Sequence, residues 1–323
     1  MSSGPVAVVD IGSNSIKVLV ATRDASGLVI ALHSRTIDAR IGAGISQLEP
    51  RLTEGGMAAG LAAIRSLLDD AARYSPARVA LVATSAVRDA SNGADFRARV
   101  RAATGHEIRI LSGHEEANLI GRGLTSDPAL RDLRDFYVFD LGGGSLECLT
   151  FRDRRIVQAV SLQLGCVRLT EKFVANPAQP FPAAATDRIA AHVRESAAAA
   201  GFKFSLARDA LVIGTGGTMA TARAILAARD GLPFDGTEPT VTVAQLRELF
   251  ATLGALPLTA RKQIAGLPPA RADVFPTALA TFIALAEIGG IAAFRNSLFN
   301  LRYGLAAELL AAASAQDLNG AQP

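Results

Sequence analysis

Two stretches of the chain share one pattern of apolar and polar positions. In the first, the apolar residues 6–9 end at Asp10, and a second apolar run begins after Ser15. In the second, an apolar run ends at Asp140, and the next begins after Ser145. Short apolar runs bounded by turn residues are typical of buried strands. Because the two stretches match position by position, the sequence predicts two similar β-rich halves.

Each stretch carries a turn that suits an anion. Both read strand, Asp, Ile or Leu, Gly, two further residues, Ser, strand. Glycine lets backbone N–H groups come close to a phosphate. Either turn alone also fits a plain hairpin, whereas two copies facing each other across a cleft favour a phosphate-processing enzyme. The candidate phosphate-binding residues are Asp10, Gly12, Ser13, Asn14, Ser15, Gly142, Gly143, Gly144 and Ser145.

The two copies differ in their charge. Glu147 of the second copy has Lys17 as its counterpart in the first. Asp140 and Glu147 together could hold a hydrated Mg²⁺ that neutralises a bound phosphate. We therefore expect the metal on the side of the second turn.

Strands and helices alternate along the rest of the chain. Alternation of this kind predicts an α/β fold with a largely parallel or mixed sheet. We expect a third strand over 27–31, and the helical spacing of apolar residues predicts a helix over 53–74. Further helices are expected over 94–103, 187–200, 219–229, 275–288 and from about 304 to 313, with strands over 78–83, 107–111 and 210–213.

Two further sites have more than one interpretation. Ser112 and Glu115 match a helix capping box, which leaves Glu116 without a structural task. A solvated surface carboxylate is one reading of Glu116, and a cleft carboxylate is the other. The Gly/Thr turn at 214–218, which contains Gly216 and Gly217, lies at a strand-to-helix junction. It suits either an anion on helix N-terminal amides or simple packing.

Composition narrows the class of protein. Half of the 323 residues are hydrophobic, the net charge is +3, and no Lys/Arg block occurs, so we expect no nucleic-acid partner. The N-terminal run contains Asp10 and Ser13, so we expect neither a signal peptide nor a membrane span. Cys148 and Cys166 read as buried free thiols in a reducing compartment. These features predict a soluble cytoplasmic protein.

Several ordered motifs carry a resemblance to a known family. They lie at residues 9–15, 83–88, 112–117, 140–145, 214–218, 267–273 and 301–304. Over about residues 5 to 310 the chain resembles the exopolyphosphatase/guanosine pentaphosphate phosphohydrolase (Ppx/GppA) family, in its short two-domain form. The resemblance implies the actin-like ATPase fold, with two ribonuclease-H-like domains around a central cleft. The expected boundaries are 1–125 and 126–305, followed by a helix end and frayed tail over 306–323.

The resemblance also implies roles for individual residues. Glu116 corresponds to the catalytic base, and Asp140 and Glu147 to the metal- and phosphate-site acids. Arg88 corresponds to a basic residue near the phosphate chain. Mg²⁺ or another divalent cation is the implied cofactor, and a homodimer the implied assembly. Leu146 stands where a threonine is usual, and His114 is unusual before the acidic pair.

The implied reaction is hydrolysis of the terminal phosphoanhydride of polyphosphate or guanosine pentaphosphate, releasing orthophosphate. Phosphoryl transfer depends mainly on positioning and charge neutralisation, which these residues could supply. An ATP-dependent kinase of the same fold is one rival, and it requires an adenosine pocket around residues 214–218. A weakly catalytic sensor that binds polyphosphate or an alarmone is the other.

Overall fold

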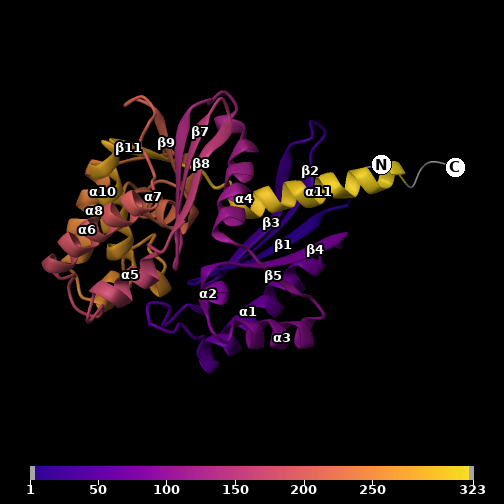
Figure 1. The fold of residues 1–323 in the computed structure, drawn as a ribbon, viewed down its shortest axis with the longest axis horizontal. Coiled ribbons are helices and arrows are strands. Elements are labelled where there is room, and N and C mark those ends of the chain that lie inside the picture. The colour runs from indigo at the N-terminus through magenta and orange to yellow at the C-terminus, as the bar shows by residue number, and fades with distance from the viewer. Residues whose placement is uncertain (1–3, 320–323) are drawn as a thin grey trace. The chain divides into compact units, whose positions relative to one another are not determined.

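The computed structural model describes residues 4–319, which form two compact units (Figure 1). Unit 1 comprises the residues up to Asp132 together with those from Phe299 onward, and unit 2 comprises Leu133–Leu298. The chain therefore leaves unit 1 and returns to it. The two units are defined by contacts within the chain, which do not show that either unit folds on its own. The expected domain boundaries therefore stay a prediction.

Unit 1 is built on a five-stranded sheet. β1 (Val6–Ile11) pairs antiparallel with β2 (Ile16–Arg23), which pairs with β3 (Val29–Ile37). On its other side β1 pairs parallel with β4 (Arg78–Ala83), which pairs with β5 (Ile108–Ile110). The sheet is accompanied by α1 (Glu54–Ala72), α2 (Ser85–Asp89), α3 (Gly93–Thr104), α4 (Gly113–Thr125), the short η1 (Pro128–Leu130) and α11 (Leu301–Asn319).

Unit 2 repeats this plan and extends it by one strand. β6 (Phe136–Leu141), β7 (Leu146–Arg152) and β8 (Arg155–Leu162) form an antiparallel meander, and β9 (Leu211–Thr215) pairs parallel with β6. β11 (Ala293–Asn296) and β10 (Thr240–Thr242) complete the sheet. Its helices are α5 (Cys166–Phe173), α6 (Ala183–Ala199), α7 (Gly216–Arg229), α8 (Val243–Gly254), α9 (Leu258–Arg261) and α10 (Phe275–Gly289), with short η2 (Phe234–Gly236) and η3 (Pro269–Arg271).

The turn that begins each meander has the same geometry in both units. The amide of Gly12 donates to the carbonyl of Ser15 over 3.1 Å, and the amide of Gly142 donates to the carbonyl of Ser145 over 3.0 Å. The internal repeat inferred from the sequence is therefore also a structural repeat.

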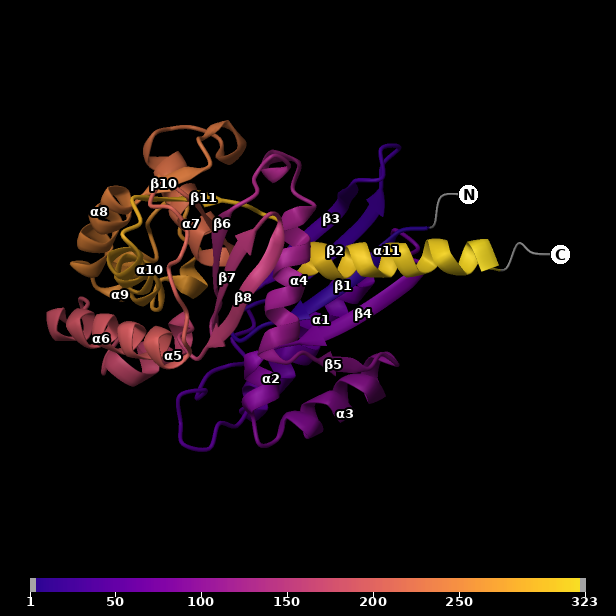
Figure 2. The same cartoon turned by 45° about the horizontal axis from the view of Figure 1, so that its top comes forward.

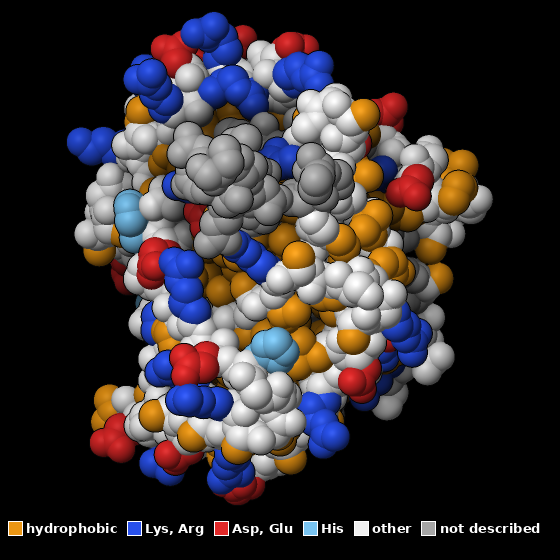
Figure 3. Space-filling model, turned by 90° about the vertical axis from the view of Figure 1, so that its right-hand side faces the viewer, with side chains coloured by type: hydrophobic (Ala, Val, Ile, Leu, Met, Phe, Trp, Pro, Cys, Tyr) orange, Lys and Arg blue, Asp and Glu red, His pale blue; other side chains and the backbone are white. Residues whose placement is uncertain are grey.

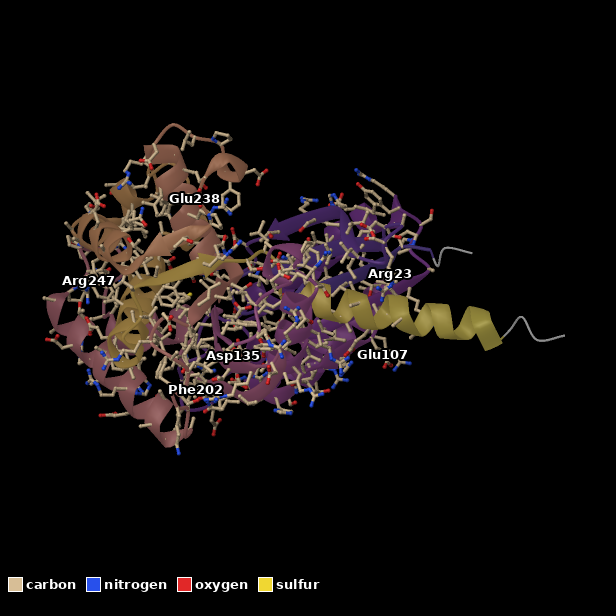
Figure 4. The ribbon with its side chains drawn as sticks, turned by 90° about the horizontal axis from the view of Figure 1, so that it is seen from above. Arg23, Glu107, Asp135, Phe202, Glu238 and Arg247 are labelled. Carbon is tan, nitrogen blue, oxygen red and sulfur yellow. The ribbon has the colours of Figure 1, made fainter. Side chains whose placement is uncertain are left out.

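Helices cover both sheets. In unit 1, α1 packs against β1, β2 and α3, while α4 and α11 pack together, and α11 also contacts β1 and β2 (Figure 1). In unit 2, α10 is almost wholly buried and packs against α5, α6 and α8 (Figure 2). Aromatic rings fill the core of unit 2, where Phe202 (labelled in Figure 4) packs against Tyr137, Phe139 and Phe204. Across residues 4–319, no helix combines the length and the apolar character needed to cross a membrane.

The predicted helices agree best with the structure. Thr53 caps α1 through the amide of Gly56, and Gly105 ends α3 with φ of 73°. The third strand was placed wrongly, since β3 runs over residues 29–37 with most of its side chains exposed. An exposed edge strand needs no apolar run, so the hydrophobic pattern misses it. α2 and β11 were not predicted because they are short, and α11 continues past residue 313 to Asn319.

Candidate active site

The turn of unit 1 is fixed from one side by the segment that follows β3. The amide of Arg40 donates to the carbonyl of Asn14 over 2.9 Å, and the amide of Gly42 donates to the carbonyl of Ser13 over 2.8 Å. A side chain on Gly42 would meet the Cβ of Ser13 at 2.6 Å, so only glycine allows this approach. The hydroxyls of Ser13 and Ser85 lie 3.1 Å apart, which joins the turn to the start of α2.

Asn14 has an unusual environment within this turn. Its side chain is 4% exposed, and neither Oδ1 nor Nδ2 has a hydrogen-bond partner among residues 4–319. A buried polar group without a partner costs about 1–3 kcal/mol. The side-chain carboxamide of Asn14 therefore fits a polar group supplied from outside the chain, such as a phosphate oxygen.

Glu116 lies in the first turn of α4, beside a complete capping box. The hydroxyl of Ser112 accepts from the amide of Glu115, and the Glu115 carboxylate accepts from the amide of Ser112 over 2.9 Å. Glu116 is only 7% exposed, so its reading as a surface carboxylate is wrong.

Arg88 holds the Glu116 carboxylate in place. Its Nη1 donates to Glu116 Oε2 over 3.2 Å and to the carbonyl of Leu111 over 2.9 Å. Its Nε lies 3.3 Å from Asp89 Oδ1. Because α2 carries both Ser85 and Arg88, it links the unit 1 turn to the buried carboxylate. Asp10 stands at the end of β1, opposite Lys17 in the β1–β2 ladder.

The turn of unit 2 packs directly on the start of α5. The amides of Cys166 and Val167 donate to the carbonyls of Gly142 and Gly143, over 3.0 and 2.9 Å. A side chain on Gly165 would meet the backbone of Gly143 at 2.3 Å. These contacts use the carbonyls of the turn. Among residues 4–319, the amides of Gly143, Gly144 and Ser145 have no acceptor.

Asp140 and Glu147 stand directly opposite each other on β6 and β7. Opposed residues of an antiparallel pair project from the same face of a sheet. Glu147 is 2% exposed, and the hydroxyl of Ser161 on β8 donates to its Oε1 over 2.7 Å.

This acidic pair fits a magnesium ion better than a metal with many protein ligands. Over the described residues, no group of three or more His, Cys, Asp or Glu side chains could hold a metal. Mg²⁺ commonly binds through one or two carboxylates and fills its other positions with water and substrate phosphate. Asp140 and Glu147 can supply those two carboxylates.

The Gly/Thr turn of unit 2 lies against the side chain of Asp140. Gly216 has φ of 81°, and a side chain there would meet Asp140 Oδ1 at 2.1 Å. A side chain on Gly217 would meet Arg271 Nη1 at 2.0 Å. The absence of side chains at these two glycines thus lets the carboxylate of Asp140 and the guanidinium of Arg271 come close to the turn. They begin α7, whose N-cap residue Thr215 forms no side-chain cap.

Two arginines of this site were not predicted from the sequence. Arg168 is buried on α5, and its Nε donates to the carbonyl of Gly144 over 3.0 Å. Arg271 lies over Gly217, and its buried Nε has no partner among the described residues. Neither position has a local signal, because each arginine meets the turns only through the tertiary fold.

Comparison with known proteins identifies the family. A model of the Ppx/GppA phosphatase family matches residues 2–313. The chain belongs to this family. The resemblance inferred from the motifs is confirmed, and with it the expectation that the chain is an enzyme, a phosphatase.

Solved structures of Ppx/GppA proteins share the fold. An exopolyphosphatase from Cytophaga hutchinsonii is 22% identical and superposes with a TM-score of 0.85, with 95% of this chain and 98% of that one covered. An exopolyphosphatase-like protein is 24% identical, with a TM-score of 0.85 and coverage of 96% and 98%. The Ppx/GppA enzyme of Aquifex aeolicus is 23% identical, with a TM-score of 0.75 and coverage of 94% and 99%. The predicted α/β fold of the actin-like ATPase type is confirmed.

Proposed function

We propose that this Ppx/GppA protein is an exopolyphosphatase that removes the terminal phosphate of polyphosphate, with guanosine pentaphosphate as a further substrate. The turn of unit 2 supports this assignment most strongly. Among residues 4–319, the amides of Gly143, Gly144 and Ser145 have no acceptor, and Glu147 stands opposite Asp140. Unpartnered backbone amides bind phosphate oxygens, and acids beside them bind the cation that a polyanion requires.

Binding of the terminal phosphate is assigned to the turns and their basic neighbours. Gly142, Gly143, Gly144 and Ser145 would bind it through the backbone, and Arg271 would add a charge-assisted bond from its place over Gly217. Arg168 would act as a positioning residue, since it holds the carbonyl of Gly144. In unit 1, Asp10, Gly12, Ser13, Asn14 and Ser15 are likewise assigned to phosphate binding.

A divalent cation held by Asp140 and Glu147 would offset the negative charge that develops on the transferred phosphoryl group. Ser161 would keep Glu147 oriented toward that task through its hydrogen bond to Oε1. A bound carboxylate that is itself hydrogen-bonded is typical of metal sites in proteins.

Glu116 is assigned the role of general base. An ionised carboxylate that is held by Arg88 can orient a water molecule and accept its proton. The water oxygen then forms a bond to the terminal phosphorus. The bond from that phosphorus to the bridging oxygen breaks, and orthophosphate and the shortened chain leave. Arg88 would also contact the phosphate chain, as the family resemblance implies.

The surroundings of the Gly/Thr turn favour hydrolysis over the kinase alternative. A nucleoside would need open space at Gly216 and Gly217, yet even a Cβ atom on these glycines would meet the side chains of Asp140 and Arg271. The carboxylate of Asp140 and the guanidinium of Arg271 beside this turn suit a site for a metal ion and a phosphate group. Release of orthophosphate from polyphosphate without any acceptor would separate hydrolysis from phosphoryl transfer to a second substrate.

The decisive experiment compares two neighbouring glutamates. Phosphate release from long polyphosphate, tripolyphosphate, guanosine pentaphosphate and ATP would be measured with Mg²⁺ and with EDTA. We expect Glu116→Gln to lower kcat by about 10²- to 10⁴-fold, whereas Glu115→Gln retains the capping box and near-normal kcat. Equal kcat in both variants would contradict the assignment of Glu116 as the general base. Tight binding of polyphosphate without release by the wild-type protein would favour the sensor instead.

Three expectations about the protein's context stay predictions. Gel filtration with light scattering tests the homodimer. Fractionation of cells tests the cytoplasmic location. A filter-binding assay with DNA and RNA tests the expected absence of a nucleic-acid partner.

A further inference from the structure

A cluster of basic side chains lies on the surface of unit 2 formed by α5 and α6. Lys172, near the end of α5, places its Nζ 3.2 Å from Nε2 of His192 on α6. Arg188, one turn before His192, donates from Nη2 to the carbonyl of Phe173 over 2.9 Å. Both cations also lie over the Phe173 ring, at 5.3 and 5.8 Å from its centroid. Packing on the ring therefore holds the two charges in one place.

These two cations are not neutralised by acids. No carboxylate of residues 4–312 forms an ion pair with Lys172 or Arg188. Some surface arginines of unit 2 do have acidic partners, as Arg247 (labelled in Figure 4) has in Glu287 at 3.0 Å. On a different face of the molecule, which Figure 3 shows, Lys and Arg side chains lie interspersed with Asp and Glu. The α5–α6 cluster thus leaves two fixed positive charges for an external anion.

The histidine supports this reading. Its pKa is lowered by burial and, next, by the neighbouring Lys172 ammonium, while Glu195 opposes the shift. A neutral imidazole accepts one hydrogen bond from Lys172 and adds no charge. The ammonium keeps its full charge and two further donors.

The cluster is connected to the candidate phosphate site by a single helix. α5 begins against Gly143 and Gly144, where Gly165 and Arg168 touch the turn. It has eight residues and so extends about 12 Å at 1.5 Å per residue. Lys172 follows Arg168 by four residues, so the two side chains lie on the same side of the helix. A polyphosphate that begins at the turn has to be several phosphates long to match the length of this helix, and tripolyphosphate is shorter than that.

We infer that Lys172 and Arg188 form a second anion site, which binds the inner phosphates of a long polyphosphate whose end lies in the turn of unit 2. This role rests on the proposed hydrolysis of polyphosphate. The enzyme binds long chains more tightly than short ones through charges outside the reacting centre.

The test compares two double variants of equal charge. Lys172→Ala/Arg188→Ala removes the cluster. Arg194→Ala/Lys262→Ala removes one exposed arginine and one exposed lysine that also lack ion-pair partners among the described residues. For the first variant we expect KM for long polyphosphate to rise about three- to tenfold, with kcat and both constants for tripolyphosphate unchanged. The slope of log KM against log salt should also fall by about 0.7 per cation removed.

Binding provides a readout that does not depend on turnover. Fluorescence anisotropy of labelled long polyphosphate would be measured with each double variant in a Glu116→Gln background, and Lys172→Arg/Arg188→Lys should restore affinity. Equal affinity of the cluster variant and its control, or an equal rise of KM for tripolyphosphate, would overturn the second anion site. If the wild-type protein released no phosphate from any substrate but the differences in binding were still present, only the proposed function would be contradicted.

Discussion

Arg88 Nη1 donates to both Glu116 Oε2 and the carbonyl of Leu111, over 3.2 and 2.9 Å. One nitrogen thus connects the proposed base to the segment between β5 and α4. The guanidinium also reaches Asp89 through Nε. A planar fork of donors can make these contacts together, whereas a lysine ammonium cannot match them.

The first prediction concerns this arginine. Arg88→Ala removes the guanidinium that pairs with the buried Glu116 carboxylate, so we expect kcat to fall at least about tenfold and stability to fall by about 3 kcal/mol. Arg88→Lys should retain stability better than kcat, because the charge stays and the geometry is lost. Steady-state kinetics and urea unfolding measure the two effects. An Arg88→Lys enzyme with wild-type kcat would show that charge alone is sufficient.

The second prediction concerns the contact between α5 and the phosphate turn. Gly165→Ala would place a methyl group 2.3 Å from the backbone of Gly143 and Gly144. Since backbone atoms cannot move aside cheaply, we expect a loss of about 1–3 kcal/mol and a loss of activity larger than the loss of folded protein. Gly55→Ala on α1, where nothing lies within 4 Å, is the control. It should stabilise the protein by up to about 1 kcal/mol. Full activity of Gly165→Ala would mean that the turn need not stay fixed.

The sequence was informative where the determinants are local. A repeated Asp–x–Gly–x–x–Ser turn needs only a few neighbouring residues to form, and the same backbone hydrogen bond closes both copies. The capping box at Ser112 and Glu115 and the αL glycine Gly105 were readable for the same reason.

The sequence was silent where distant segments meet. Arg168 reaches the carbonyl of Gly144 across 24 positions of the chain, and Arg271, which follows α9 in the chain, lies against Gly217 at the start of α7. Both arginines resemble ordinary surface residues in their local context. The ion pair of Glu116 likewise depends on Arg88 of α2, which no pattern within α4 encodes. Side-chain partners of this kind follow from packing, so periodicity cannot predict them.

The third prediction concerns the proposed metal. Ser161→Ala removes the hydroxyl that donates to Glu147 Oε1 over 2.7 Å. Loss of such a partner typically weakens metal affinity or activity about 10- to 100-fold. We expect the Mg²⁺ concentration for half-maximal phosphate release to rise by that factor, with kcat recovered at saturating Mg²⁺. Ser161→Thr keeps the hydroxyl and should behave like the wild type. A Mg²⁺ dependence that is the same in all three proteins would contradict the metal assignment of Glu147.

The fourth prediction couples Gly217 to Arg271. A methyl group on Gly217 would lie 2.0 Å from Arg271 Nη1, and the end of a flexible side chain can move away at little cost in stability. The displaced guanidinium would no longer bind phosphate, so KM should rise about tenfold or more. Arg271→Ala should have the same effect, and the double variant should add nothing to it. Additive effects in the double variant would mean that Gly217 acts by another route.

The fifth prediction concerns the pH dependence of stability. The Arg109 guanidinium, followed by the amide and hydroxyl of Ser112, holds the pKa of Glu115 at about 2, below its ordinary value of 4.5. A carboxyl whose pKa is lower in the folded state stabilises the fold above the unfolded pKa. That stability is lost as the pH falls from about 4.5 toward 2.

Glu115→Gln should therefore destabilise the protein at neutral pH and flatten its decline in acid. The side chain of Glu115 is 42% exposed, so solvent screening reduces the effect, and added salt should reduce it further. Urea midpoints of both proteins at several pH values measure the difference, which cancels the contributions of all other acids. A difference that stays constant from neutral pH down to about pH 2 would show that the charge of Glu115, unlike its capping geometry, contributes nothing to the fold.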